Sequence, residues 1–205
     1  MPLVLLIRHA VNDYMKKGRM AGRLPGVHLN RQGQAQAEAL AEKLAGAPVK
    51  ALYSSPMERA QETAAPLAKA LGLEIITRPG LLESDIGEWN GQRWKGLSRT
   101  KIWRTVQYRP SLFRFPGGES FFEGQVRICT ELLQLCSMHE PKEVFACVTH
   151  ADPIKLAVAH FIGLPLDMFQ RLSVSPASIT ALYIGEGHSS LLTLNYDVSF
   201  TLNQS

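Results

Sequence analysis

The sequence has little cysteine and no spacing that would tie its cysteines together. Its 205 residues include only Cys129, Cys136 and Cys147. Three thiols cannot all pair, and without a C-x-x-C spacing they support neither a disulfide framework nor a zinc site. We therefore expect reduced, mostly buried thiols.

Long hydrophobic runs are also absent. The longest, such as Leu3–Ile7 and Val144–Val148, fall far short of the ~20 apolar residues that a membrane-spanning helix needs. No basic segment precedes the first run, and Arg8 and His9 interrupt it too early for a signal peptide. The sequence thus predicts no transmembrane helix and a cytoplasmic location.

Neither sign of charge dominates, because 22 lysines and arginines against 18 aspartates and glutamates give a net charge of +4. With 45% hydrophobic residues, the composition excludes a disordered tail or a fibre and is that of an ordinary globular protein. A chain of this length can bury its apolar surface in one core. We therefore predict a single domain over residues 1–205.

Apolar strands alternate with helical patterns along the chain. This order predicts an α/β fold, a three-layer α/β/α sandwich with a mostly parallel central sheet and helices on both faces. The expected strands cover residues 3–7, 49–53, 73–76, 143–149, 179–184 and 191–194. We expect the tail after Asp197 to be loose.

Capping residues indicate where helices begin. Asn30 suits the N-cap of an early helix, and Asp152 opens a late one. Two segments match the capping box: residues 55–58, with proline at the first helical position, and residues 120–123, which open a helix to about Met138.

Two histidines occupy equivalent places in this pattern. His9 directly follows the first strand, and His150 directly follows the strand over 143–149. In open α/β sheets, ligands bind outside the carboxyl ends of the strands, so these side chains can converge on one site. Each histidine alone could be a strand-end residue bonded to a loop, but the pair favours a site.

Two arginines accompany the histidines. Arg8 precedes His9, and Arg59 lies in the first turn of a predicted helix, where the helix dipole disfavours a cation. A bound phosphate would explain this position, because guanidinium groups and helix N-termini both bind phosphate oxygens. An ion pair with Glu62 is the alternative for Arg59, although it does not account for Arg8.

Four blocks of sequence together resemble the histidine phosphatase superfamily, in its phosphoglycerate-mutase-like branch. They are residues 6–10 (LIRHA), 54–64 (SSPMERAQETA), 82–91 (LESDIGEWNG) and 148–151 (VTHA), with further matches at 29–36, 116–120 and 163–165. Their order and spacing cover nearly the whole chain. The resemblance implies one phosphatase-type domain with a basic helical insertion at about 90–118.

The resemblance also implies roles for individual residues. His9 would be the nucleophile that takes the phosphoryl group, and Arg8, Arg59 and His150 would surround the phosphoryl oxygens. These side chains supply the positive charge that Mg²⁺ supplies elsewhere, so we expect no metal and no cofactor.

Glu83 matches the general acid of the family. It must be protonated at first, so its surroundings should raise its pKa, for instance through Leu81, Leu82 and Trp89, although cationic arginines would lower it. The rival acids in the same loop are Asp85 and Glu88.

Departures from the family pattern lie next to the histidines. Glycine usually follows each histidine, and here these positions hold Ala10 and Ala151, which a negative φ would tolerate. Asn12 stands where threonine is usual. Asn12, Arg23 and Ala151 join the arginines and His150 in the predicted phosphate- and substrate-binding set.

The insertion is strongly basic. No acidic residue lies between Glu88 and Glu119, but there are seven cations, namely Arg93, Lys95, Arg99, Lys101, Arg104, Arg109 and Arg114. A second basic cluster, consisting of Lys16, Lys17, Arg19 and Arg23, follows His9. In the family that the chain resembles, both segments border the phosphate pocket, which suggests a positive mouth for polyanionic substrates.

Aromatic residues are interleaved with these cations. One interpretation is a stacking surface for a nucleotide or single-stranded nucleic acid, made by Trp94, Trp103, Tyr108, Phe113 and Phe115. The interpretation that we favour is a short helix with a buried face, made by Trp94, Ile102, Trp103 and Val106, and with solvated arginines.

Three functions are compatible with the sequence. We favour metal-independent hydrolysis of a small anionic phosphorylated metabolite through a phosphohistidine. A cofactor-dependent phosphoglycerate mutase comes second. Such mutases carry a longer insertion with a paired-arginine segment, and we do not find that arrangement here. A catalytically weak protein that binds a phospholigand or nucleic acid comes third. We expect no membrane or nucleic-acid partner, and a monomer or homodimer.

Overall fold

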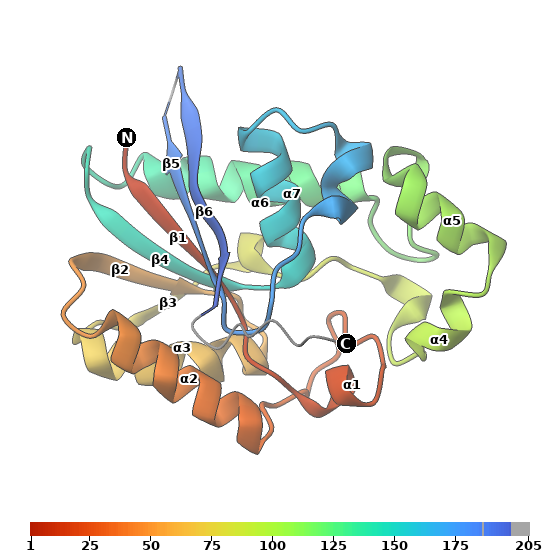
Figure 1. Cartoon of the computed structure of the whole chain (residues 1–205), viewed down its shortest axis with the longest axis horizontal. Coiled ribbons are helices and arrows are strands. Elements are labelled where there is room, and N and C mark those ends of the chain that lie inside the picture. The colour runs from red at the N-terminus through yellow and green to blue at the C-terminus, as the bar shows by residue number, and fades with distance from the viewer. Residues whose placement is uncertain (186, 198–205) are drawn as a thin grey trace, which may run out of the picture.

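The computed structural model describes residues 1–185 and 187–197, and the predicted loose tail after Asp197 lies outside them. Within this part, six strands form one sheet in the order β3-β2-β4-β1-β5-β6 (Figure 1). The strands are β1 (Leu3–Arg8), β2 (Val49–Ser54), β3 (Ile75–Thr77), β4 (Val144–Thr149), β5 (Ile179–Ile184) and β6 (Ser189–Tyr196). Strands β1 to β4 pair in parallel, and β5 is antiparallel to both of its neighbours.

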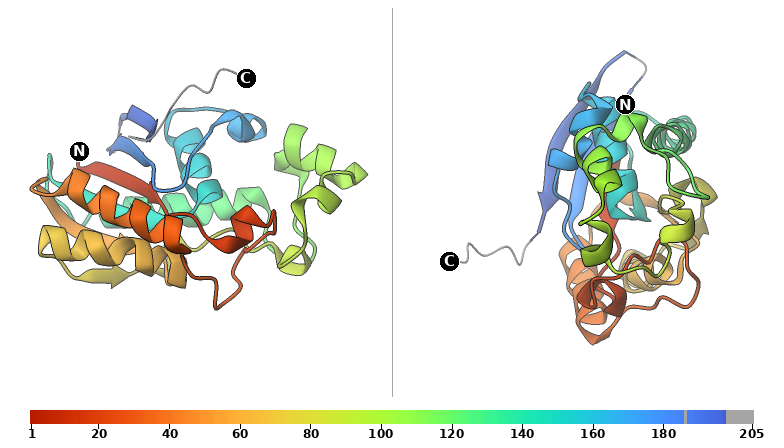
Figure 2. Two further views of the ribbon diagram at one scale, coloured as in Figure 1. Left: turned by 60° about the horizontal axis from the view of Figure 1, so that its bottom comes forward. Right: turned by 90° about the vertical axis from the view of Figure 1, so that its right-hand side faces the viewer.

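Helices cover both faces of this sheet (Figures 1 and 2). Val4 and Leu6 of β1 belong to the core under α6 (Phe121–Cys136) and α7 (Ala151–Phe161). Ile7 belongs to the core under two other helices, α2 (Arg31–Leu44) and α3 (Glu58–Leu71). Successive strand residues face opposite sides, so this short apolar run is buried on both. The predicted α/β/α sandwich with a mostly parallel sheet is confirmed.

Two of the predicted helix starts form as the sequence indicates. The Asn30 side chain accepts a hydrogen bond from the Gly33 backbone at 3.0 Å and caps α2. Ser120 and Glu123 form a complete capping box at α6. Each side chain satisfies a backbone N–H that the first helical turn leaves without a partner.

The starts of α3 and α7 differ from the predictions. Helix α3 begins at Glu58, and its N-cap residue, Met57, makes no side-chain capping hydrogen bond. The capping box predicted at Ser55 is therefore wrong. The Ser55 hydroxyl contacts His150 Nε2 at 2.8 Å and accepts from the Met57 backbone at 3.4 Å, so it does not bond to the third residue of the helix as a capping box requires. Helix α7 begins at Ala151, directly after His150, one residue earlier than predicted.

Residues 94–112 form a small helical lobe at one end of the molecule (Figure 1). It consists of α4 (Trp94–Leu97), α5 (Lys101–Tyr108) and the short 3-10 helix η3 (Pro110–Leu112). A further short helix, α1 (Asp13–Lys16), follows β1. The remaining 3-10 helices are η1 (Pro79–Leu81), η2 (Gly87–Trp89) and η4 (Leu166–Arg171).

Aromatic side chains fill the inner side of this lobe. Trp103 stacks on Trp89 with ring centroids 6.0 Å apart, and Val106 is buried. The expected buried helix face is correct for these residues. It is wrong for Trp94 and Ile102, which are 50% and 42% exposed. Phe113 and Phe115 pack in the interior beside Trp89, and Trp94 packs against Trp103 with ring centroids 5.5 Å apart.

The three cysteines are free thiols and mostly buried, as expected. Cys129 and Cys147 are buried free thiols, and Cys136 is a partly buried one. Within residues 1–185 and 187–197, no helix combines the length and the hydropathy needed to cross a bilayer.

Candidate active site

The two histidines meet at one edge of the sheet. Strands β1 and β4 are parallel neighbours, with Arg8 in register with Thr149. His9 and His150 therefore leave the sheet side by side, and their ring centroids lie 5.1 Å apart. Both residues are buried, since His9 is 4% exposed and His150 is 0% exposed. The strand-end reasoning correctly predicted that they would meet.

Arg59 joins the two histidines. Its Nε lies 3.3 Å from His9 Nε2, and its Nη2 lies 3.3 Å from His150 Nδ1 and donates to the Gly22 carbonyl at 2.7 Å. The residue is only 1% exposed. The alternative ion pair with Glu62 does not form, because that carboxylate contacts His28 Nδ1 at 2.5 Å and accepts from the Leu29 backbone.

His9 is held as a neutral ring. Its Nδ1 lies 2.8 Å from the Ala10 carbonyl oxygen, which can only accept, so Nδ1 carries the hydrogen and Nε2 keeps its lone pair. Burial, reinforced by the cations Arg59 and Arg8, lowers the pKa of His9 well below its usual value. The ring is thus uncharged at neutral pH, with Nε2 directed toward Arg59.

His150 is neutral for the same reasons. Burial is the largest cause of its lowered pKa, followed by the charge of Arg59. Arg59 donates toward Nδ1, so we assign the hydrogen to Nε2, which donates to the Ser55 hydroxyl at 2.8 Å. Ser55 therefore fixes the orientation of this ring, a role that the sequence did not indicate.

Three buried N–H donors around His9 lack partners. Arg8 Nε, Arg59 Nη1 and Asn12 Nδ2 make no hydrogen bond within the described part of the chain. All three residues line one pocket together with His9. Buried donors without partners are costly, and an oxyanion is the ligand that would satisfy several at once. This donor set is suited to the oxygens of a phosphoryl group.

The protein holds two of these donors firmly. Arg8 Nη1 donates to the Val174 carbonyl at 2.5 Å. Asn12 caps α1, and its Oδ1 accepts from the Met15 backbone at 3.0 Å, while Nδ2 has no partner among the described residues. The structure thus gives Asn12 a donor at the pocket.

The alanines that replace glycine do not strain the backbone. Among the described residues other than glycine, positive φ occurs only at Lys142, Ala177 and Asn195, so Ala10 and Ala151 meet the condition for tolerance. Of the predicted binding set, neither Ala151 nor His150 is among the residues that line the pocket.

Glu83 has the protonation expected of a general acid. Its pKa is raised to about 7, first by burial and then by the negative charge of Asp152, while Arg59, the Ser84 backbone and Arg8 act in the opposite direction. Its Oε2 lies 4.0 Å from His150 Nδ1. Two causes thus raise the pKa of Glu83, namely burial and the charge of a second carboxylate. From the sequence, only apolar neighbours were expected to raise it.

Asp152 is a site residue that the sequence analysis missed. It lines the pocket with Glu83 and is bound by Lys155 Nζ at 2.9 Å. The only available signal was an acidic residue two positions after His150, which we had interpreted as a helix start. The rival acids Asp85 and Glu88 do not line this pocket.

Arg23 contacts the backbone of Glu83 and is not among the residues that line the pocket. Its Nε donates to the Glu83 carbonyl at 2.7 Å, and its Nη2 contacts Glu119 at 3.1 Å. Arg127 bridges the same two residues, since its Nη2 lies 2.7 Å from the Glu119 carboxylate and 3.5 Å from the Glu83 carbonyl. Glu119, Arg23 and Arg127 thus hold in place the loop that carries Glu83.

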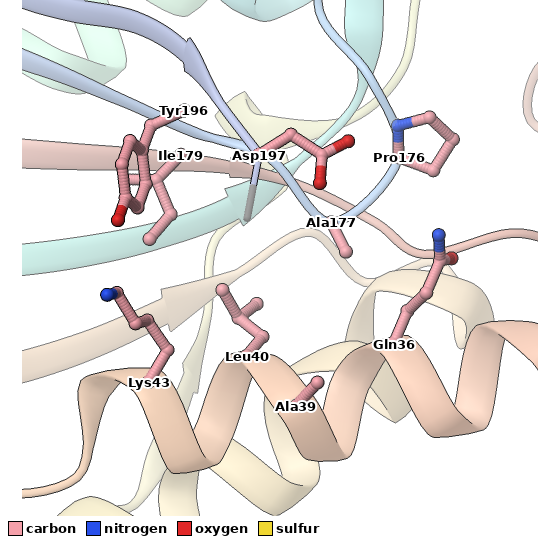
Figure 3. Close-up of a pocket in the computed structure, with 9 residues that line it drawn as sticks. All are labelled: Gln36, Ala39, Leu40, Lys43, Pro176, Ala177, Ile179, Tyr196 and Asp197. Carbon is pink, nitrogen blue, oxygen red and sulfur yellow. The ribbon is translucent and has the colours of Figure 1, made fainter. Parts of the chain in front are cut away.

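A second hollow lies away from the histidines, between α2 and the ends of β5 and β6 (Figure 3). It is lined by Gln36, Ala39, Leu40, Lys43, Pro176, Ala177, Ile179, Tyr196 and Asp197. None of the proposed catalytic residues is among them, so the pocket at His9 is the candidate site. Within the described residues, no cluster of histidine, cysteine and acidic side chains is suited to a metal ion.

Comparisons with known proteins agree with this geometry. The family model of the histidine phosphatase superfamily (branch 1) matches residues 4–197. Phosphoserine phosphatase 1 of Hydrogenobacter thermophilus is 28% identical, over 94% of this chain and 91% of that protein. A 2,3-bisphosphoglycerate-dependent phosphoglycerate mutase of Thermoplasma acidophilum is 30% identical, over 95% and 92%.

Among solved structures, a mycobacterial glucosyl-3-phosphoglycerate phosphatase in complex with VO3 has a TM-score of 0.87 and 26% identity. The match covers 95% of this chain and 99% of that one. The predicted family is therefore confirmed, and with it the histidine type of phosphatase. The chain belongs to the histidine phosphatase superfamily.

Proposed function

We propose that the protein hydrolyses phosphomonoesters through a phosphohistidine formed on His9, with Glu83 as the general acid and base. One observation carries the proposal: a neutral His9 whose Nε2 keeps its lone pair stands among buried N–H donors that lack partners within the described residues. Relatives named as phosphatases support hydrolysis as the outcome. The proposed substrate is a small anionic phosphorylated metabolite.

In the first step, the lone pair of His9 Nε2 attacks phosphorus in line, and the ester P–O bond breaks. Glu83 gives its proton to the departing oxygen, so the leaving group departs as an alcohol. Arg8, Arg59 and Asn12 donate to the phosphoryl oxygens as negative charge shifts onto them. The Ala10 carbonyl accepts from Nδ1–H and steadies the phosphorylated ring.

In the second step, a water molecule attacks the phosphohistidine. The Glu83 carboxylate takes a proton from this water, the P–N bond breaks, and inorganic phosphate leaves. The electron pair of that bond returns to Nε2, and Glu83 is protonated again. A pKa of about 7 suits both halves of the cycle, because the carboxyl can give and take a proton near neutral pH.

A phosphoglycerate mutase is the second candidate, since the relative of Thermoplasma acidophilum carries that name. A mutase would use the same phosphohistidine but return the phosphoryl group to another hydroxyl of its substrate. It would need a bisphosphate primer to load His9. Hydrolysis of phosphomonoesters without a primer separates the two activities.

The test is hydrolysis of a panel of phosphomonoesters in EDTA by the wild type and by His9→Ala. We expect turnover in the wild type, loss of at least about 1,000-fold in the variant, and acid-labile phosphohistidine after rapid quenching of the wild type only. His28→Ala is the matched control, because His28 is an exposed histidine paired with Glu62. Full hydrolysis by His9→Ala would overturn the proposal.

A further inference from the structure

A third arginine lines the pocket besides Arg8 and Arg59. Arg19 lies there with Met15, Met20 and Ile86. The pocket thus combines hydrogen-bond donors for a phosphoryl group with apolar side chains and one more cation. The proposed mechanism uses Arg8 and Arg59 but leaves Arg19 without a role.

The backbone and side chain of Arg19 are both held in place. Its N–H donates to the Tyr14 carbonyl at 2.8 Å, and its Nε donates to the Gly91 carbonyl at 2.8 Å. The guanidinium carbon lies 5.7 Å from the centre of the Tyr14 ring. These contacts restrict an exposed side chain that would otherwise sample many rotamers, and they use only one of its nitrogen atoms.

The loop that carries Arg19 is tied to the start of the lobe. Arg19 forms an antiparallel bridge with Arg93, and Met20 exchanges backbone hydrogen bonds with Gly91 and Gln92, at 2.8 and 2.9 Å. Farther along the same loop, the Gly22 carbonyl accepts from Arg59. One short segment thus connects Arg19 to an arginine of the phosphate site.

Arg19 differs in its partners from Arg23, Arg114 and Arg127. Arg23 and Arg127 are paired with Glu119, and Arg114 is paired with Glu123. Arg19 forms no ion pair within residues 1–185 and 187–197, the part that the structure describes. Its positive charge is therefore available to a ligand in the pocket.

We propose that Arg19 is a specificity residue that binds a second anionic group of the substrate, a carboxylate or another phosphate. A short carbon chain would lie along Met15, Met20 and Ile86, between this group and the phosphoryl group at His9. The guanidinium group suits either anion, because it presents paired donors to two oxygens. This inference rests on the proposed function and names its substrate class.

The experiment uses three phosphomonoesters with the same three-carbon chain. Propyl phosphate has no second anion, 3-(phosphonooxy)propanoate has a carboxylate, and propane-1,3-diyl bisphosphate has a second phosphate. We expect the wild type to prefer at least one of the two compounds that carry a second anionic group. Arg19→Met should lower kcat/KM for that compound by about 10- to 100-fold, mainly through KM, and for propyl phosphate by less than about 2-fold.

Two further variants distinguish direct contact with the second anionic group from general electrostatic attraction. Arg93→Met removes the same charge from the partner across the bridge, which does not line the pocket, and should change the preference by less than about 2-fold. Arg19→Lys should recover part of the loss, since it restores the positive charge but not the paired donors of the guanidinium group. The difference between the carboxylate and the bisphosphate identifies the class of anion.

Calorimetric binding of the same three compounds keeps the test independent of turnover. If no ester is hydrolysed but Arg19→Met selectively weakens binding of a compound with a second anionic group, the proposed function fails and the role of Arg19 stands. Equal losses on all three compounds, or a wild type without preference, would overturn the role of Arg19 even where hydrolysis is normal.

Discussion

At the scale of single residues, Glu83 poses the main chemical problem of the site. The proposed first step needs this carboxyl in its protonated form, yet Arg8 and Arg59 lie close to it and their charges favour its ionised form. Burial outweighs them, and the charge of Asp152 in the same pocket adds to burial. Asp152 is itself held by Lys155, so its negative charge is fixed where it repels ionised Glu83.

This arrangement predicts a pH dependence with a definite sign. The first step needs protonated Glu83, so kcat/KM should fall as pH rises through about 7, the pKa of that carboxyl. Asp152→Asn removes one cause of the raised pKa and should move this alkaline limb to lower pH. The measurement is a pH profile of kcat/KM.

Asp85→Asn is the matched control for Asp152→Asn. Asp85 is a carboxylate on the Glu83 loop, near Arg23 and outside the pocket lining, and its variant should keep the wild-type profile. An alkaline limb that stays in place in Asp152→Asn would show that burial alone holds the proton on Glu83.

The same pKa makes a prediction for stability. The pKa of Glu83 is raised from 4.5 in the reference state to about 7 in the fold, so folding binds a proton more tightly. Its contribution is complete below pH 4.5 and is lost as pH rises to about 7. Glu83→Gln should therefore show a smaller decline in unfolding free energy across this range than the wild type, measured by urea titration at several pH values.

Sequence reasoning was most successful for residues whose place follows from topology. His9 and His150 follow adjacent parallel strands, so their meeting could be expected before any coordinates. Asp152 and Ser55 could not be recognised, because both types also suit helix starts. Only the three-dimensional arrangement shows that Ser55 contacts His150 and that Asp152 faces the pocket.

At the scale of secondary-structure elements, two serines with similar sequence contexts have different tasks. Ser120 caps α6 through the Glu123 backbone at 3.1 Å, whereas Ser55 serves the ring of His150 and leaves α3 without a side-chain cap. The capping-box pattern is a local signal, so it cannot tell a hydroxyl used by the helix from one used by a distant strand end.

These two serines give a paired prediction. Ser120→Ala should lower the unfolding free energy by about 1 kcal/mol and leave kcat unchanged, because it removes an N-cap. Ser55→Ala should lower kcat by about 10-fold or more, because His150 loses the group that orients it. Denaturant titration and steady-state kinetics of both variants check this division. A large kinetic effect of Ser120→Ala would contradict it.

At the scale of the whole molecule, the strand order could not be derived from the sequence. The alternating pattern indicates parallel strands and two helical layers, but β1 lies between β4 and β5 through pairings that span most of the chain. The lobe over residues 94–112 was expected as part of a basic helical insertion at about 90–118. Phe113 and Phe115, which follow the lobe, pack against Phe121 of α6, a contact that local periodicity does not reveal.

The pocket also links binding to the stability of the whole fold. The donors Arg8 Nε, Arg59 Nη1 and Asn12 Nδ2 are buried without partners among the described residues, so a bound oxyanion stabilises the native state alone. Inorganic phosphate should therefore raise Tm, with a stabilisation of about 2.7 kcal/mol at 100 times its Kd. Arg59→Met should abolish the shift, because it removes a donor at the centre of the site. Arg104→Met, which changes an exposed cation of the lobe, should keep it. Equal shifts in both variants, measured by thermal denaturation with phosphate, would mean that the anion binds elsewhere.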